Sequence, residues 1–278
     1  FWALTKMRQT ALLLVTGAFS HCLSCGEGID AVEAARMATA LLLSIAGCTA
    51  LNMLLDRNVD RKMGRTAVRP LPSARLGASE AAIFGVGLSG AGLALAFSLD
   101  PLFGLVDVLG FAFYLLLYTA WLKGRTPLSI VIGGIAGGMP ALGGRVLALG
   151  HVDLVGILLA LSVVLWVPSH ILTLSLRYAE DYCQARVPVW PTHYGPGPTR
   201  RFIAAANLLN AAALAACALL LRVHAAALVG IAAVTLVTST LAFLQMLSPT
   251  EGRNWLLFKL ASFHMLGTFV LLLAGSLL

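Results

Sequence analysis

The sequence predicts an all-α, polytopic membrane protein, a bundle of nine transmembrane helices. Hydrophobic residues make up 59% of the 278 residues and charged residues only 11%, whereas soluble domains carry about a quarter charged residues. Apolar stretches also recur along the chain at lengths near the ~20 residues that a helix needs to cross the hydrocarbon core. The chain length suits one such bundle, so we expect a single domain over residues 1–278.

Nine apolar stretches account for most of the chain. The first lacks the pattern of a cleaved signal peptide and is counted as a true span. The second begins with acidic residues, Glu27, Asp30 and Glu33, that suit a helix N-terminus. Pro127, Pro140 and Pro168 are expected to kink the fifth and sixth stretches. Glycine clusters in the third and fifth predict close helix packing, with room for a ligand as the less favoured alternative. The predicted spans cover residues 9–25, 32–54, 78–98, 102–122, 127–149, 153–177, 201–221, 224–246 and 254–277.

Basic residues are distributed unequally between the predicted loops. With the N-terminus inside and the nine spans alternating, all but three of the 19 Lys and Arg residues fall on the inner side. The three exceptions are Arg36, Arg145 and Arg222. Because loops rich in Lys and Arg stay in the cytoplasm, the N-terminus and the long loops are predicted to be cytoplasmic, in a protein of the plasma membrane.

The net charge of +7 is explained by this topology and by attraction to anionic membrane lipid or to a diphosphate. Nucleic acid is not expected as a partner, because the sequence has no stripe of basic residues interleaved with aromatic ones.

The first long inner loop, NMLLDRNVDRKMGRTAVRPLPS at residues 52–73, carries a ladder of oxygen ligands. Asn52, Asp56 and Asp60 are spaced four residues apart, so on a helix they share one face. This amide and these two carboxylates suit Mg²⁺, which bridges to substrate phosphates. Guanidinium groups nearby can bind phosphate oxygens. The basic residues of this loop are Arg57, Arg61, Lys62, Arg65 and Arg69. A solvated basic loop neutralised by two aspartates is the alternative; the metal–diphosphate interpretation is favoured.

The second long inner loop, PSHILTLSLRYAEDYCQARVPVWP at residues 168–191, supplies another pair of acids. Paired across the bundle with the first loop, Asp181 would complete a metal site, and Tyr182 would line an apolar cavity. Alternatively, Glu180 and Asp181 are ion-pair partners for Arg177 or Arg186 at a helix end. Spacing alone leaves both interpretations open.

Three further polar residues lie where inner loops meet spans. Lys123 and Arg125 precede the fifth span, where they could bind phosphate or anchor the topology. His170 lies near the inner end of the sixth span. An ionisable residue inside a membrane is a functional candidate, with a hydrogen bond between helices as the alternative.

These motifs together resemble the UbiA superfamily of intramembrane prenyltransferases. The resemblance covers almost the whole chain, and its most specific part is the string DRxxDxxMxRTxxRPLPS in the first loop. It implies nine helices, two aspartate-rich inner loops and Mg²⁺ as the cofactor. The other matching segments are LTKMR at 4–8, GRTPLSIVIGGIAGGMPALGG at 124–144, EDYCQARVP at 180–188 and WLLFKLASFHM at 255–265.

The resemblance also implies roles for individual residues. Asn52, Asp56 and Asp60 would hold Mg²⁺ and diphosphate, with Asp181 from the other loop. Within the superfamily the sequence is most similar to protohaem IX farnesyltransferases, which implies farnesyl diphosphate as donor, protohaem IX as acceptor and haem O as product. His170 is the candidate for contact with the acceptor. The other positions predicted to contact substrate are Lys6, Arg65, Arg69, Lys123, Arg125, Arg177, Glu180 and Tyr182.

Other functions stay open at this point. The sequence departs from the haem-modifying group at Ser169, which precedes His170, and over residues 185–190, near the expected acceptor pocket. A UbiA-type enzyme acting on a quinone precursor, another tetrapyrrole or a glycerol lipid is therefore the alternative. A membrane transporter is less favoured, because the carboxylates cluster at the inner mouth and no central span carries a relay of acids.

Overall fold

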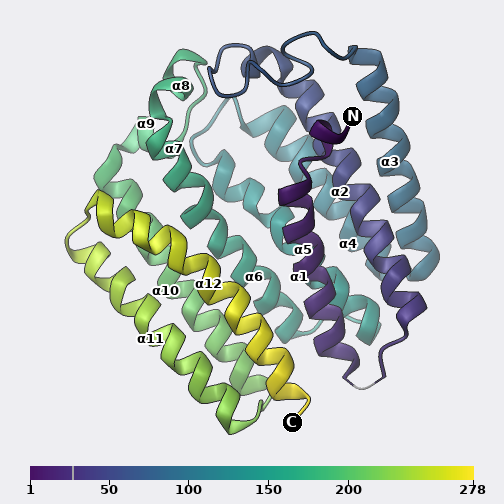
Figure 1. Ribbon diagram of the computed structural model, residues 1–278, viewed down its shortest axis with the longest axis vertical. Helices are drawn as coiled ribbons and strands as arrows, with labels where there is room; N and C mark the ends of the chain where they lie inside the picture. Colours follow the sequence, from purple (N-terminus) through teal and green to yellow (C-terminus); the bar gives the residue numbers. More distant parts are fainter. Residues whose placement is uncertain (27) are drawn as a thin grey trace.

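The computed structural model describes residues 1–26 and 28–278 and arranges them as an elongated bundle of helices (Figure 1). The first half contains the 3-10 helix η1 (Trp2–Thr5), α1 (Met7–Cys25), α2 (Ala31–Asp60), α3 (Ala78–Leu99), α4 (Pro101–Ala112), the π-helix η2 (Phe113–Leu122) and α5 (Ser129–Leu149). The second half contains α6 (Leu154–Val167), the π-helix η3 (Pro168–Leu172), α7 (Thr173–Arg177), α8 (Ala179–Gln184), α9 (Trp190–Tyr194), α10 (Pro196–Leu220), α11 (Ala225–Leu247) and α12 (Glu251–Ser276).

Eight helical stretches in the described residues are long and apolar enough to cross a membrane. Two of them are composite, because α4 continues through η2 and α6 continues through η3 and α7. The prediction of nine spans is close to this count. The additional predicted span is α1, which runs alongside α2 and α5 (Figure 1) but buries several polar side chains: Thr10, Thr16, Ser20 and His21.

The helices begin where the sequence supplies caps. Asp30 Oδ1 accepts the Val32 backbone N–H at 2.8 Å and so caps α2, while Asp100 and Asp153 cap α4 and α6 in the same way. Such caps satisfy backbone donors that have no partner within the helix. Glu27, predicted to belong to the start of α2, lies outside the described residues.

Close packing of α2 against α3 depends on small residues. A Cβ added at Gly92 would lie 2.8 Å from the Ala40 carbonyl oxygen, and one at Gly85 would lie 2.8 Å from the Leu51 side chain. By contrast, Gly87 and Gly90 face open space. The predicted packing role therefore holds for one face of α3, and the backbones approach there because no side chain intervenes.

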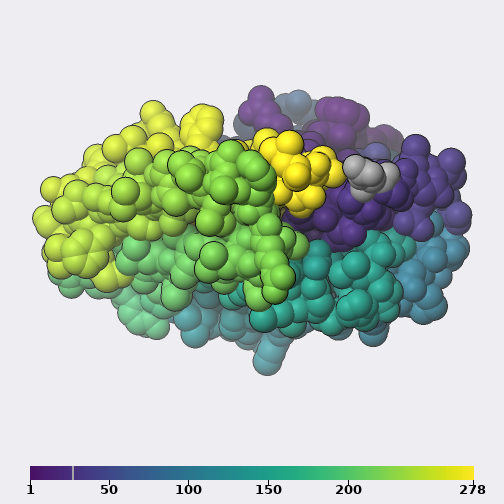
Figure 2. Space-filling model, turned by 90° about the horizontal axis from the view of Figure 1, so that it is seen from below, coloured from purple at the N-terminus to yellow at the C-terminus, as the bar shows by residue number. Residues whose placement is uncertain are grey.

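The two ends of the bundle differ. The N-terminus, the α2–α3 loop and helices α7 to α9 lie at one end, which we call the inner end, and the C-terminus lies at the other (Figure 1). Seen from the end that holds the C-terminus, which we call the outer end, helices α10 to α12 form one half of an oblong outline (Figure 2). The N-terminal helices form most of the other half. Both predicted loops thus share the inner end.

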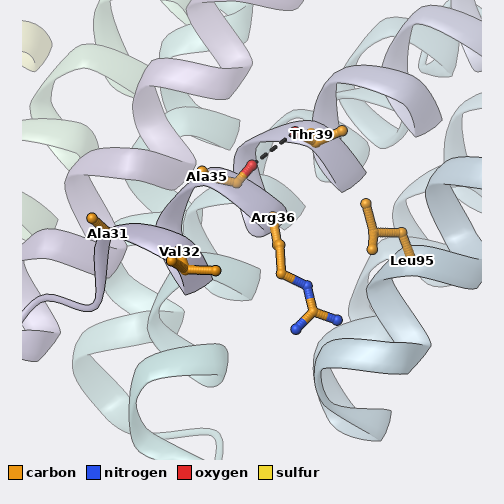
Figure 3. A pocket seen from close by; sticks show the side chains of 6 residues that line it. All are labelled: Ala31, Val32, Ala35, Arg36, Thr39 and Leu95. Atoms are coloured by element: carbon orange, nitrogen blue, oxygen red, sulfur yellow. Dashed lines mark hydrogen bonds between the residues drawn. The ribbon is translucent and has the colours of Figure 1, made fainter.

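An open groove of about 380 Å³ lies near the start of α2 (Figure 3). Leu95 of α3 faces it across from Arg36 of α2. It contains none of the predicted site residues, so the candidate chemistry lies elsewhere. Its lining residues are Ala31, Val32, Ala35, Arg36, Thr39 and Leu95.

Candidate active site

The inner end of α2 presents the predicted ladder of oxygen ligands. Asn52, Asp56 and Asp60 are buried, with 2%, 6% and 3% of their surface exposed. Asn52 Nδ2 donates to Asp56 Oδ2 at 2.8 Å, as expected for residues one turn apart on the same helix face. Buried carboxylates are costly unless paired, so their partners define the site.

Three basic residues from separate segments converge on this ladder. Lys6 Nζ donates to Asn52 Oδ1 at 2.6 Å, Lys123 Nζ to Asp56 Oδ2 at 2.6 Å and Arg69 Nη1 to Asp60 Oδ2 at 2.7 Å. Lys6 precedes α1, Arg69 lies in the α2–α3 loop, and Lys123 follows η2. The structure therefore brings together six residues that the sequence analysis singled out, with three cations against two acids.

Backbone geometry fixes two of these segments. Lys6 has left-handed φ and ψ of 44° and 50° between η1 and α1, a conformation that non-glycine residues adopt rarely and at some cost. In the α2–α3 loop, Thr66 Oγ1 donates to the Asp60 carbonyl at 2.9 Å and Arg61 Nε donates to the Pro72 carbonyl at 3.1 Å. These bonds fold the loop back so that Arg69 reaches Asp60.

The charges at the site shift one another's titration. Burial, assisted by the positive charge of Arg69, lowers the pKa of Lys6 to about 8. Burial also acts to lower the pKa of Lys123, but Tyr118 and Asp56 outweigh it and the pKa lies above its ordinary value. Lys123 is therefore the firmly charged lysine, and Lys6 is the one whose charge responds to moderately alkaline pH.

Two neutral residues that the sequence analysis missed complete the hydrogen bonds of Asn52. Thr119 Oγ1 accepts from Asn52 Nδ2 at 3.0 Å, and the Tyr114 hydroxyl donates to Asn52 Oδ1 at 3.4 Å. Both lie in the π-helix η2, a geometry that is rare and frequent at functional sites. Their only signal in the sequence was a hydroxyl within an apolar stretch.

Asp107 of α4 was also missed. Ser44 Oγ donates to its Oδ1 at 3.0 Å, and its buried Oδ2 has no hydrogen-bond partner in the described part of the chain. A lone acid in the fourth apolar stretch was the available signal, since ionisable residues inside membranes are rare.

The second loop lies at the same end but does not close the predicted three-acid set. Glu180 is exposed and Asp181 half-buried on α8, and within residues 1–26 and 28–278 no group of three acidic, His or Cys side chains is placed to hold a metal. Over the same residues, neither acid forms an ion pair with Arg177. The proposed role of Asp181 in metal binding stays a prediction.

The remaining basic candidates lie around the second loop. The Arg65 guanidinium lies 4.9 Å from the centre of the Tyr178 ring, and that of Arg177 lies 5.4 Å from the Trp255 ring. Tyr182 packs against the apolar cluster under α8 and α9, and Arg125 is exposed beyond Lys123. Arg65 therefore links the two inner loops through Tyr178, whereas Arg125 stands outside the buried network.

His170 lies in η3 and is half-buried. Its ring is stacked between Trp166 and Phe258, and its buried Nδ1 has no hydrogen-bond partner among the described residues. The alternative of a hydrogen bond between helices is therefore not observed at Nδ1.

The donor atoms at the end of α2 fit a magnesium ion. Hard oxygen ligands from one amide and two carboxylates are the type that Mg²⁺ prefers. Asn52 and Lys123 bind Oδ2 of Asp56, and Arg69 binds Oδ2 of Asp60. Among the described residues, Oδ1 of each aspartate is left for a cation. Mg²⁺ would be held by Asp56 and Asp60, while Asn52, whose Oδ1 already accepts from Lys6 and Tyr114, would position Asp56.

Comparison with known proteins decides the family. The model of the UbiA prenyltransferase family matches residues 13–275. The chain belongs to the UbiA prenyltransferase family. Its fold class and its identity as a prenyltransferase, predicted from the motifs, are confirmed.

Curated relatives of this UbiA-family chain include archaeal proteins named Protoheme IX farnesyltransferase. The one from Thermofilum pendens is 40% identical over 274 residues, covering 97% of this chain and 95% of the relative. The one from Korarchaeum cryptofilum is 44% identical over 206 residues, covering 74% and 69%.

Solved structures share the fold at lower identity. A digeranylgeranylglyceryl phosphate synthase superimposes with a TM-score of 0.83 at 20% identity, covering 99% of this chain and 96% of that one. A UbiA homologue from Archaeoglobus fulgidus bound to DMAPP and Mg²⁺ gives a TM-score of 0.70 at 13% identity, covering 97% and 98%. These likenesses establish the UbiA architecture.

Proposed function

We propose that this prenyltransferase transfers a farnesyl group from farnesyl diphosphate to protohaem IX, in a Mg²⁺-dependent reaction that gives haem O and diphosphate. The observation that carries the donor half is the buried network of Lys6, Arg69 and Lys123 on Asn52, Asp56 and Asp60 at the polar end of an apolar bundle. The acceptor is supported by relatives named Protoheme IX farnesyltransferase along almost the full chain.

The donor half follows from charge. Bound Mg²⁺ would stabilise negative charge on the leaving diphosphate, and an A. fulgidus UbiA homologue bound to GPP and Mg²⁺ supports this assignment. Arg69 and Lys123 already contact the two carboxylates and Lys6 contacts the Asn52 amide oxygen, so these cations can bind phosphate oxygens without new burial of charge. Preorganised cations of this kind act where charge develops in the transition state.

The rest of the bundle would hold the isoprenoid. Apolar helices exclude water from an allylic carbon as its bond to oxygen breaks. We expect the chain of the donor to extend from the charged end into the helices, so that only the diphosphate meets the polar residues. The plasma membrane, with the inner end facing the cytoplasm, is the proposed location.

The acceptor half uses the electrons of a vinyl group. The vinyl π electrons form the new C–C bond to the farnesyl carbon while the C–O bond to diphosphate breaks, and the electron pair leaves with diphosphate. Water then adds to the remaining carbon and loses a proton, which gives the hydroxyethylfarnesyl side chain. His170 is the residue proposed to meet the acceptor.

The test is a competition between acceptors. Purified protein in detergent would be incubated with farnesyl diphosphate, Mg²⁺ and an equal mixture of haem b, a quinone precursor and a glycerol-phosphate lipid, followed by mass analysis. We expect the farnesylated product to be haem O. A prenylated quinone precursor or lipid with unmodified haem would assign the chain to another UbiA activity. In a separate assay with the protein in liposomes, uptake of a substrate without diphosphate release would indicate a transporter.

A further inference from the structure

The ring of His170 is part of a continuous aromatic stack between α6 and α12. Its centroid lies 4.9 Å from that of Trp166, with the rings 18° apart, and 5.2 Å from that of Phe258, with the rings 16° apart. Trp255 continues the stack, 5.0 Å beyond Phe258. The imidazole is therefore stacked against aromatic rings from both α6 and α12, which leaves its edge as the approach for a ligand.

The orientation of this ring does not come from a hydrogen bond at Nδ1. That nitrogen is buried without a partner in the described part of the chain. A metal-binding histidine usually has its orientation fixed by a hydrogen bond from its second nitrogen. At His170, ring stacking fixes the orientation in place of that hydrogen bond. The Trp166 indole is itself held in place, because its Nε1–H donates to Ser262 Oγ at 3.3 Å.

The backbone around His170 is also held in place. Pro168 begins the π-helix η3, and proline cannot donate the backbone hydrogen bond of a regular turn. The next residue, Ser169, is hydrogen-bonded to Asn207 of α10. A π-helical turn anchored to a neighbouring helix fixes the direction in which the imidazole leaves the backbone, and such turns recur at functional sites.

The stack ends in positive charge at its inner end. The Arg177 guanidinium lies 5.4 Å from the Trp255 ring and 6.0 Å from the Tyr178 ring, and Arg65 covers Tyr178 at 4.9 Å. A flat, hydrophobic acceptor that carries carboxylates could therefore place them near two arginines while its centre faces the edge of His170.

We propose that Trp166 and Phe258 are positioning residues that hold His170 with its ring edge toward the acceptor, so that its Nε2 can bind the iron of a metalloporphyrin. This inference rests on the proposed function and adds to it the mode of acceptor binding. Nδ1 is the buried nitrogen, so Nε2 is the ligating atom, and neutral imidazole is a common axial ligand of haem iron.

The experiment titrates the purified full-length protein with haem b in detergent, without prenyl diphosphate, and records the Soret and electron paramagnetic resonance spectra. We expect an imidazole-ligated signature that His170→Gln abolishes. Trp166→Leu and Phe258→Leu stay apolar but remove stacking, and should weaken haem affinity by about tenfold or more, as loss of a supporting contact does at metal sites. Trp166→Phe, which keeps an aromatic face, should retain most of it.

Two controls separate iron ligation from general packing. Metal-free protoporphyrin IX should bind wild type and His170→Gln with similar affinity, because it has no iron to ligate. The second control is His264→Gln. His264 lies in the same bundle and is hydrogen-bonded to Thr235 at 3.1 Å, so this variant should keep the wild-type haem spectrum.

An unchanged haem spectrum in His170→Gln, or leucine variants that only lower thermal stability, would overturn the inference. Haem O formation without imidazole ligation would leave the proposed function standing and remove this inference. Imidazole ligation of haem without any haem O formation would support this inference and remove the proposed function.

Discussion

Asn52 is the residue on which the donor site is organised. Its Nδ2 donates to Asp56 and Thr119, and its Oδ1 accepts from Lys6 and Tyr114. All the hydrogen-bonding capacity of the amide is therefore directed at the site. It fixes Asp56 on one side and Lys6 on the other, which relates the N-terminal segment to α2.

The titration of Lys6 gives a pH dependence of donor binding. Its pKa is lowered to about 8 by burial and by Arg69, so in the free protein the lysine loses its proton as the pH rises through 8. An anionic diphosphate favours the protonated form. We therefore expect the Kd for a non-hydrolysable farnesyl diphosphate analogue to be flat below pH 8 and to rise above it by up to about tenfold per pH unit.

Calorimetric titration between pH 7 and pH 10 would measure this dependence. Lys6→Arg is the matched control, since arginine stays charged over the whole range, and its Kd should change less. Identical profiles for wild type and Lys6→Arg would contradict the assignment of this pKa to the binding site.

Residue spacing predicted only part of this network. The four-residue ladder of Asn52, Asp56 and Asp60 follows from helix geometry, because all three belong to one element. The contact of Lys6 with Asn52 joins residues 46 apart and depends on how α1 packs, which no local pattern specifies. Lys6 was identified only through the resemblance of LTKMR to the family.

At the scale of the elements, the site depends on α2 remaining close to α3. Gly92→Ala would place a methyl group against the Ser44 backbone and 2.8 Å from the Ala40 carbonyl oxygen. We expect this overpacking to lower the free energy of unfolding by about 1–3 kcal/mol. Thermal unfolding in detergent would measure it as a lower Tm.

Gly90→Ala is the matched control on the same helix, because a Cβ there meets nothing within 4 Å. Its Tm should be unchanged or slightly higher, since alanine has the higher helix propensity. Equal losses in the two variants would show that the packing face of α3 has been misassigned.

The aromatic stack around His170 shows that contacts between helices could not be predicted from the sequence. Trp166 and His170 are one helical turn apart, a spacing that the sequence displays, but Phe258 and Ser262 come from α12. Apolar and aromatic residues in a membrane helix can face lipid or protein equally well, so the sequence could not show which of them met His170.

At the scale of the whole molecule, both inner loops lie at one end of the bundle (Figure 1). Cys183 of α8 is exposed, whereas Cys48 and Cys217 are buried. In a Cys22→Ser/Cys25→Ser background, a membrane-impermeant maleimide should label Cys183 in inside-out vesicles. Right-side-out vesicles should react only after detergent is added.

This labelling tests the orientation predicted from the basic loops. Labelling of Cys183 from the outside would contradict the proposed cytoplasmic location of the site. The unequal distribution of Lys and Arg predicted that the two long loops lie on the same side, because it sums over many residues. The distance between Asp181 and the α2 ladder, by contrast, depends on how α8 packs, and spacing could not predict it.

The central claim is that the buried aspartates at the inner end of α2 drive release of diphosphate from a prenyl donor. The most direct measurement is diphosphate release from farnesyl diphosphate with Mg²⁺ and haem b, in Asp56→Asn and Asp60→Asn, with Asp100→Asn as control. Asp100 caps α4, and asparagine caps helices equally well. Thermal unfolding would confirm that each variant is folded, and Asp56→Glu would show whether charge alone suffices. We predict that kcat/KM falls by about a hundredfold or more in both site variants and stays near wild type in Asp100→Asn. Wild-type turnover in folded Asp56→Asn and Asp60→Asn would contradict the account.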